Sequence, residues 1–211
     1  MNVMFRYIGL AVAVFAFPCI ASAHRLDEYL QATRIDVEFD CIKMEINLTP
    51  GAAVANEVIA MIDRDRNGEI SEGERASYAR NVVATLSLEF DGQSQPLTLN
   101  TSSIPAIADM QRGEGVIRLG ATARISGAAT GHHHLRFAAT QQSDIGVYMV
   151  NALVPSDARV RILGMSRDML QREFDLDYSI SPSKRPIEMA AIWPPLLGLV
   201  LTAAILVVAR R

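Results

Sequence analysis

Apolar and polar residues alternate over most of the chain between residues 29 and 180. In residues 41–48 the apolar side chains are Ile42, Met44, Ile46 and Leu48, and mostly polar residues stand between them. Such alternation turns one face of a β-strand toward a core and the other toward solvent. The same pattern recurs in further runs, which are residues 29–39, 85–90, 97–100, 117–125, 133–139, 147–154, 160–163 and 174–180.

Short turn sequences separate these runs of alternating residues. They are Asp91-Gly92, Gly113-Glu114-Gly115, Gly127, Gly131 and Pro155-Ser156-Asp157. Many short strands joined by regular turns are typical of an antiparallel sandwich or a partly open barrel. We therefore predict a mainly β fold, an antiparallel β-sandwich-like domain over residues 24–183.

The pattern changes to a helical period between residues 50 and 86. Thr49 is suited to cap a first helix that begins at Pro50, because proline is tolerated at the first helical position. Ser71 and Glu74 form the sequence of a capping box for a second helix. The inward stripes are Ala55, Val58, Ile59 and Ile62 in the first helix, and Ala76, Ala79, Val82 or Val83, and Leu86 in the second. This predicts a helical hairpin, residues 50–86, inserted into the β domain.

Both ends of the chain are apolar. Residues 1–23 combine Arg6, an apolar run and the small-residue site Ala21-Ser22-Ala23, which predicts a secretory signal peptide; an uncleaved anchor is the alternative. Residues 189–209 carry no charge, and about 21 residues are enough for a transmembrane helix. A buried core helix is the alternative there.

These ends predict one topology. Trp193 suits the outer membrane interface, and the tail of residues 210–211, Arg210 and Arg211, suits the cytoplasmic side. The domain would then face the periplasm or the outside from a single span in the inner membrane. Removal of Cys19 with the signal would leave Cys41 alone, which excludes an intramolecular disulfide in the mature chain.

A calcium-binding loop is expected between the two predicted helices, from Asp63 to Glu74. Calcium takes six to eight oxygen ligands, and a 12-residue loop supplies them at fixed positions with a glycine at position 6. Gly68 stands at that glycine position. The expected ligands are Asp63, Asp65, Asn67, Glu69 by its backbone carbonyl, Ser71 through a water, and bidentate Glu74. The alternative is a polar turn that holds no ion.

Residues 52–86 resemble the EF-hand family in this loop and in the apolar stripe that precedes it. The sequence departs from the family at Arg75, where an apolar residue is usual, and it contains one loop where hands commonly pair. The hand is therefore either single or paired through Ile70 in a homodimer. Arg64 and Arg66 reduce the negative potential of the loop, so we expect weak affinity, a dissociation constant of about 10⁻⁵ to 10⁻³ M.

Histidines offer a second, alternative metal site. On a strand, His132 and His134 would share one face and could bind nickel, cobalt, copper or zinc, whereas His133 would face inward. His24, at the expected mature start, would add an amine and an imidazole. For His132–His134 the competing interpretation is an exposed strand without metal. For His24 it is a solvated chain end.

No catalytic motif supports an enzyme: G-x-S-x-G, H-E-x-x-H, phosphate-loop and C-x-x-C patterns are all missing from the sequence. We therefore expect that the protein is not an enzyme, and the alternative is an enzyme whose active site is not recognisable from the sequence. The net charge of −3 gives no indication of a nucleic-acid partner.

Two further segments resemble known exported proteins. Residues 24–30 (HRLDEYL) and residues 147–157 (VYMVNALVPSD) are similar to uncharacterised exported bacterial single-span proteins. The first segment is also loosely similar to the extracytoplasmic domain of hydrogenase/urease-accessory nickel and cobalt permeases. Those permeases have several spans, and this chain has one expected span. The resemblance therefore implies an accessory role in metal handling, with a neighbouring membrane metal transporter as partner.

Overall fold

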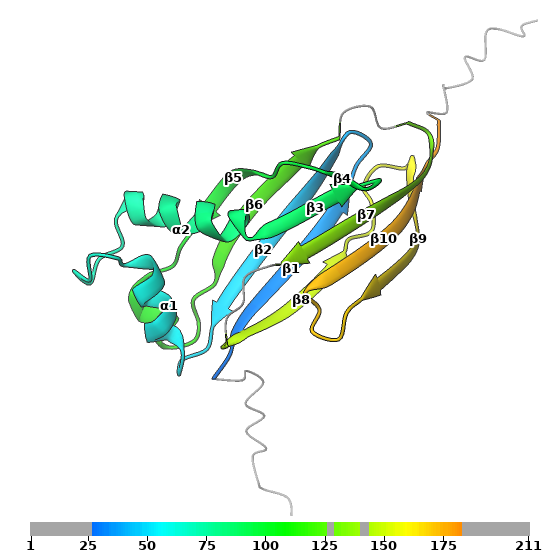
Figure 1. Cartoon of the computed structure of the whole chain (residues 1–211). Coiled ribbons are helices and arrows are strands. Elements are labelled where there is room, and N and C mark those ends of the chain that lie inside the picture. Colours follow the sequence, from blue (N-terminus) through cyan, green and yellow to red (C-terminus); the bar gives the residue numbers. More distant parts are fainter. Residues whose placement is uncertain (1–26, 126–128, 140–143, 183–211) are drawn as a thin grey trace, which may run out of the picture.

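The computed structural model describes residues 27–125, 129–139 and 144–182, and over these residues the chain is mainly β (Figure 1). Ten strands in this part of the chain form two five-stranded sheets. The first sheet has the order β5 (Thr98–Ser103), β6 (Ile117–Arg124), β2 (Cys41–Pro50), β1 (Tyr29–Val37) and β8 (Gly146–Ala152). The second has the order β4 (Gln93–Ser94), β3 (Leu86–Phe90), β7 (Gly131–Ala139), β10 (Glu173–Ile180) and β9 (Val160–Arg167).

The two sheets share one hydrophobic core. Alternate residues of β2 are buried, and so are alternate residues of β10, so each sheet turns one face inward. Leu48 of the first sheet and Phe174 of the second are both fully buried and belong to the same cluster. The expectation of a mainly β domain built from half-buried strands is therefore confirmed.

One strand pairing departs from the predicted antiparallel arrangement. β1 pairs with β2 in antiparallel register but with β8 in parallel register, from Tyr29 opposite Gly146 to Ile35 opposite Ala152. The other strand pairs among the described residues are antiparallel. Hydrophobic alternation reports which face of a strand is buried and carries no information about strand direction.

The helical hairpin follows β2 and consists of α1 (Ala55–Ile62) and α2 (Glu72–Ala84), which lie at one end of the sheets (Figure 1). The predicted start at Pro50 with Thr49 as cap is wrong, because both residues belong to β2 and Pro50 lies opposite Tyr29. Proline is typical of a helix start, but here it occupies the last position of a strand. Leu86, predicted on the second helix, is the first residue of β3.

Helix α2 is fixed to the sheets by its buried face. Tyr78, Ala79, Val82 and Val83 are all buried, and the Tyr78 hydroxyl hydrogen-bonds the hydroxyl of Tyr29 at the start of β1. Burial raises the pKa of Tyr78 to about 12, so the phenol stays neutral. The hairpin is thus part of the core and not a free appendage.

A short third helix, α3 (Ile107–Gln111), follows β5 and was not predicted. Its Met110 is fully buried, whereas the helix is too short to show a period. No helix among the described residues has both the length and the apolar character needed to cross a bilayer. The expected signal (residues 1–23), span (189–209) and tail (210–211) lie outside the described residues.

Candidate metal centre

The first residue of the predicted calcium loop is buried at the end of α1. Asp63 is 5% exposed, and its backbone N–H bonds the carbonyl of Ile59, which closes the helix. Its two carboxylate oxygens accept from the backbone N–H groups of Asn67 (3.2 Å) and Gly68 (3.0 Å). The carboxylate therefore faces into the loop and not toward solvent.

The middle of the loop is a tight turn around Asn67. Gly68 has a φ of +82° and Arg66 a φ of +60°, both in the left-handed region that glycine adopts at least cost. Asp65 accepts from the Asn67 N–H (3.1 Å) and from the Asn67 side-chain amide (3.0 Å). The side-chain oxygen of Asn67 accepts from the N–H of Glu69 at 2.8 Å.

The last residue of the loop, Glu74, caps α2 and reaches back across the turn. One carboxylate oxygen accepts from the N–H (2.9 Å) and the hydroxyl (2.7 Å) of Ser71, which completes the predicted capping box. The other accepts from the N–H of Arg64 at 2.7 Å. The hydrogen bonds from Ser71, followed by the backbone N–H of Arg64, lower the pKa of Glu74 to about 2. This carboxylate is therefore ionised at any physiological pH.

Three of the predicted ligands converge. Carboxylate oxygens of Asp63, Asp65 and Glu74 lie within 4.8 Å of one another. Two oxygens bound to one calcium ion at about 2.4 Å can be at most about 4.8 Å apart. The donor set consists only of hard oxygens, which suits calcium or magnesium and not a soft transition metal. The arrangement therefore fits a calcium ion.

The remaining predicted ligands are not all free in this conformation. The Ser71 hydroxyl bonds Glu74, and the Asn67 side-chain oxygen bonds the N–H of Glu69. Glu69 is expected to bind through its backbone carbonyl, and its exposed side chain lies outside the group of three converging carboxylates. An arriving ion would replace hydrogen bonds within the loop, because the same oxygens serve both.

Ile70, through which a second hand would pair, is engaged within its own chain. Its side chain is half-buried against the core, and Arg75 donates from Nε to its carbonyl at 3.1 Å. Arg75 stands where the EF-hand family usually has an apolar residue, and it lines a cavity of about 340 Å³ between the loop and the start of α3. Sequence reasoning did not foresee this contact.

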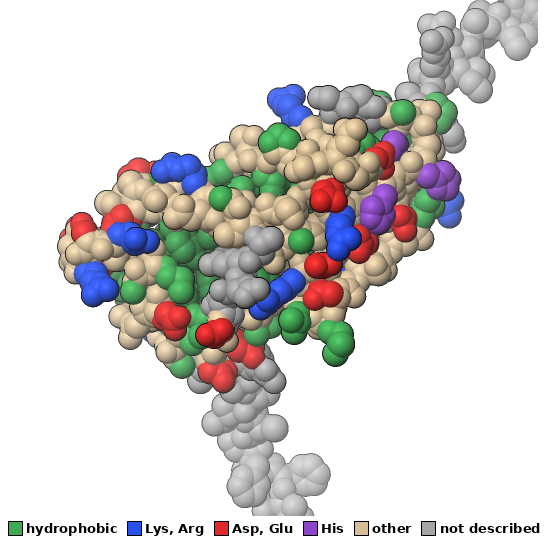
Figure 2. Space-filling model, viewed as in Figure 1, with side chains coloured by type: hydrophobic (Ala, Val, Ile, Leu, Met, Phe, Trp, Pro, Cys, Tyr) green, Lys and Arg blue, Asp and Glu red, His purple; other side chains and the backbone are tan. Residues whose placement is uncertain are grey.

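The three histidines of β7 alternate as predicted, with His132 and His134 exposed and His133 turned inward. His134 lies between two carboxylates of β10, Asp177 (Nδ1, 2.9 Å) and Asp175 (Nε2, 3.2 Å), and Figure 2 shows histidines beside acidic side chains on this surface. Their hydrogen bonds, that of Asp177 first, raise the pKa of His134.

His133 is also held by two acceptors. Its Nδ1 bonds Asp91 (2.8 Å), its Nε2 bonds the carbonyl of Ala129 (2.9 Å), and its ring packs against Phe90 and Tyr178. Neither His133 nor the exposed pair belongs to a group of three converging metal ligands within the described residues. His24 lies outside them, so the histidine metal site stays a prediction.

A second converging group, Glu38, Asp40 and Cys41, lies at the turn between β1 and β2. The Cys41 thiol donates to Glu38 at 3.2 Å. Burial, followed by the hydrogen bond to Glu38, raises the pKa of Cys41 to about 11. The group is therefore a neutral thiol beside two carboxylates, and a thiol in this state is a poor metal ligand. Adjacency of Asp40 and Cys41 was its only signal in the sequence.

Comparison of the chain with protein-family models, with curated proteins and with solved structures found no match. The resemblances to the EF-hand family and to exported proteins therefore stay predictions. The converging carboxylates of the loop are therefore the basis for inferring a function.

Proposed function

We propose that this protein binds one calcium ion in the loop from Asp63 to Glu74. The observation that carries the proposal is the convergence of three carboxylates within 4.8 Å on a turn between two helices. Unless a cation lies between them, like charges at this distance repel. Asp63, Asp65 and Glu74 would be direct ligands, with Asn67, the Glu69 carbonyl and a water on Ser71 completing the shell.

The affinity is modest, with a dissociation constant of about 10⁻⁵ to 10⁻³ M. Two features support this range. Arg64 and Arg66 place cations within the loop, and the carboxylate of Glu74 already accepts hydrogen bonds that the ion must replace. Such affinity suits a compartment where calcium is abundant, and there the site would be filled at all times.

Calcium in this site acts as a structural clamp or a local response element. Helix α2 is buried along Tyr78, Ala79 and Val82, and Tyr78 bonds Tyr29 of β1, so the hairpin has little freedom to open as a unit. The ion would fix the end of α1 against the start of α2. The loop itself is exposed around Arg64 to Glu69, and any response to calcium would be confined there.

We further propose that the domain is an exported β-sandwich held at the membrane. The signal-like residues 1–23 and the uncharged residues 189–209 support this location. The two sheets that share one core support the sandwich. The calcium-binding proposal does not depend on this location.

Isothermal titration calorimetry of the full chain with calcium chloride tests the proposal. We expect one site per chain, no comparable heat with sodium chloride, and loss of binding in Asp63→Asn and in Glu74→Gln. Asp168→Asn is the matched control, because Asp168 also accepts from two backbone N–H groups, those of Leu170 and Glu173, far from the loop along the chain. Absence of calcium-dependent heat at millimolar ion, or equal binding by Asp63→Asn, would refute the proposal.

A further inference from the structure

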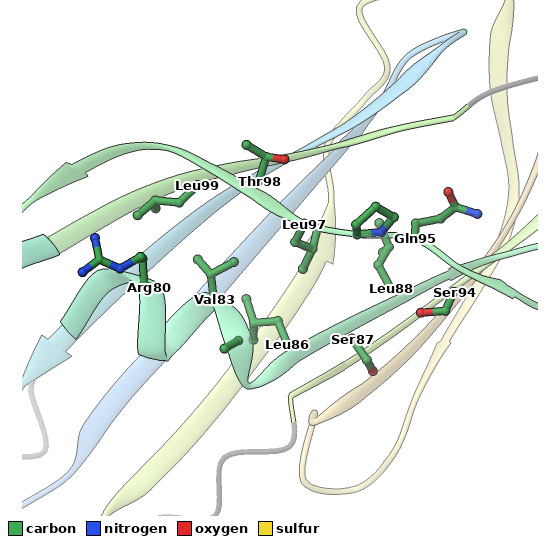
Figure 3. Close-up of a pocket in the computed structure, with 12 residues that line it drawn as sticks. Arg80, Val83, Leu86, Ser87, Leu88, Ser94, Gln95, Leu97, Thr98 and Leu99 are labelled. Carbon is green, nitrogen blue, oxygen red and sulfur yellow. The ribbon is translucent and has the colours of Figure 1, made fainter. Parts of the chain in front are cut away.

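A groove of about 670 Å³ lies where the edges of the two sheets approach α2 (Figure 3). It runs along the last turns of α2, along β3 of the second sheet, and along the connection from β4 to β5, the edge strand of the first sheet. Its volume is within the range of about 300 to 1,000 Å³ that is typical of sites for small organic ligands. Sequence reasoning gave no indication of it.

The groove opens onto the hydrophobic core. Leu88 is 1% exposed and Val83 is 6% exposed, and both belong to the core cluster. Leu86, Leu97 and Leu99 are half-buried and pack against that cluster from the groove walls. A ligand lying here would cover aliphatic surface from three elements, which favours an aliphatic chain over a polar molecule.

Charge is concentrated at one end of the groove. Arg80 is the one charged side chain among the groove-lining residues, and Figure 3 shows it beside Leu99. It is exposed and makes no ion pair or side-chain hydrogen bond with any residue that the structure describes. The far end carries the neutral side chains of Ser94 and Gln95. The groove therefore has aliphatic walls, a cation at one mouth and neutral polar side chains at the other.

A peptide strand cannot readily add to β3, which forms one wall of this groove. Strand addition needs free backbone groups along a sheet edge. Here the N–H of Gln95 bonds the carbonyl of Leu88 at 2.8 Å, and β4 pairs with Glu89 and Phe90. The edge of β3 that faces the groove is thus largely occupied by the chain itself.

We propose that the groove binds a long-chain carboxylic acid, with its carboxylate on Arg80 and its aliphatic chain over the half-buried side chains of Leu86, Leu97 and Leu99. The planar guanidinium binds a carboxylate through two parallel hydrogen bonds, a geometry that a neutral alcohol cannot provide. The apolar contacts hold the chain, and the arginine selects the charged headgroup. This site is distinct from the calcium loop, because α2 contributes Glu74 to the loop from its first turn and Arg80 to the groove two turns later.

Photolabelling tests this inference on the full chain in micelles of an uncharged maltoside detergent. The probe is hexadecanoic acid that carries a diazirine on its chain, and mass spectrometry maps the labelled peptides. We expect labelling of residues 80–99, displaced by excess hexadecanoic acid but at least about tenfold less by hexadecan-1-ol, since a hydrogen bond to a charged group contributes about this factor.

Variants distinguish recognition of the carboxylate headgroup from nonspecific binding of the aliphatic chain. Arg80→Gln should lower displaceable labelling about tenfold, Arg80→Lys should restore part of it, and Arg161→Gln on the exposed side of β9 should leave it unchanged. Labelling that is not displaceable, that maps outside the groove, or that is equal in Arg80→Gln and the parent chain would overturn the proposal. Arg80 is exposed and has no partner among the described residues, so we expect its replacement to leave the fold intact.

Discussion

Replacement of Asp63 by alanine separates what its carboxylate does for the loop from what it does for calcium. Without calcium, the substitution removes the acceptor of the Gly68 N–H, whereas the Asn67 N–H keeps its bond to Asp65. One hydrogen bond to a charged group is worth about 1.5–3 kcal/mol. Water can bond the N–H of the exposed Gly68 in place of the carboxylate, which recovers part of this energy. We therefore expect a loss of about 1–2 kcal/mol in the free energy of unfolding.

Asp63→Ala should also remove the stabilisation that bound calcium gives the folded chain. A ligand that binds only the folded state stabilises it by RT ln(1 + [L]/Kd), and 5 mM calcium with a dissociation constant of about 10⁻⁵ to 10⁻³ M gives about 1–4 kcal/mol. In a chain of this size each kcal/mol raises the melting temperature by about 2–4 °C. The parent chain should therefore gain about 2–15 °C with calcium, and Asp63→Ala should gain nothing.

Differential scanning calorimetry with 5 mM calcium chloride and with a chelator measures both losses. Asp168→Ala is the matched control, because its carboxylate also accepts from two backbone N–H groups; it should lose stability without calcium yet keep the calcium-dependent gain. If Asp63→Ala gains as much from calcium as the parent chain, the loop is not the site. If it loses no stability in chelator, the hydrogen bonds of Asp63 do not hold the loop.

Three further predictions concern α2, the histidines and the loop beside α3. Ser71→Ala should lower the free energy of unfolding in chelator by about 1 kcal/mol, since it removes the N-cap of α2. Ser77→Ala on the same helix should change the free energy of unfolding little. Equal effects of the two variants in chemical denaturation would contradict the capping role. His134→Gln should destabilise the chain most below pH 6.5, the ordinary pKa of imidazole. The difference in stability should fade as pH rises through the raised pKa of His134, because a raised pKa stabilises the fold only while the group is protonated. Urea unfolding of both proteins from pH 5 to 9 measures this difference, and a difference independent of pH would contradict the prediction. Gly115→Ala should lower the free energy of unfolding by about 1–3 kcal/mol, because its new methyl carbon would lie 2.8 Å from the backbone nitrogen of buried Met110. Gly164→Ala, whose methyl carbon would lie 3.9 Å from its nearest neighbour, should lower it much less. Equal melting temperatures of the two variants would show that the structure near Met110 rearranges to accept the methyl group.

The strands that alternate clearly were predictable, and those that do not were missed or shortened. β2 and β10 each bury every second residue, so their sequences report their faces. β5 has a mostly polar sequence, because it is an edge strand that covers little of the core, and its second half was not predicted. Pro50 ends β2 although proline is typical of a helix start, so the residue type alone misplaces this boundary.

The turn between α1 and α2 was predictable because its sequence signals are local. Its six expected ligands lie within one short segment, and the Ser71–Glu74 capping box formed as expected. Contacts between distant segments left no such signal. Asp177 meets His134 only because β10 pairs with β7, and Arg80 meets Leu99 only because α2 packs beside β5. Spacing along the chain carries no information about either pairing.

The parallel pairing of β1 with β8 decides when the domain can be completed. Residues 29–35 of β1 can pair with residues 146–152 of β8 only after β8 has been synthesised. More than 100 residues must therefore leave the ribosome before the first sheet gains its last strand. Pairings of such long range slow folding and leave a strand edge open meanwhile. β1 and β2 can form as a hairpin early, but the outer edge of β1 stays exposed until β8 arrives. Truncation before residue 146 should therefore leave the outer edge of β1 unpaired and prone to aggregation.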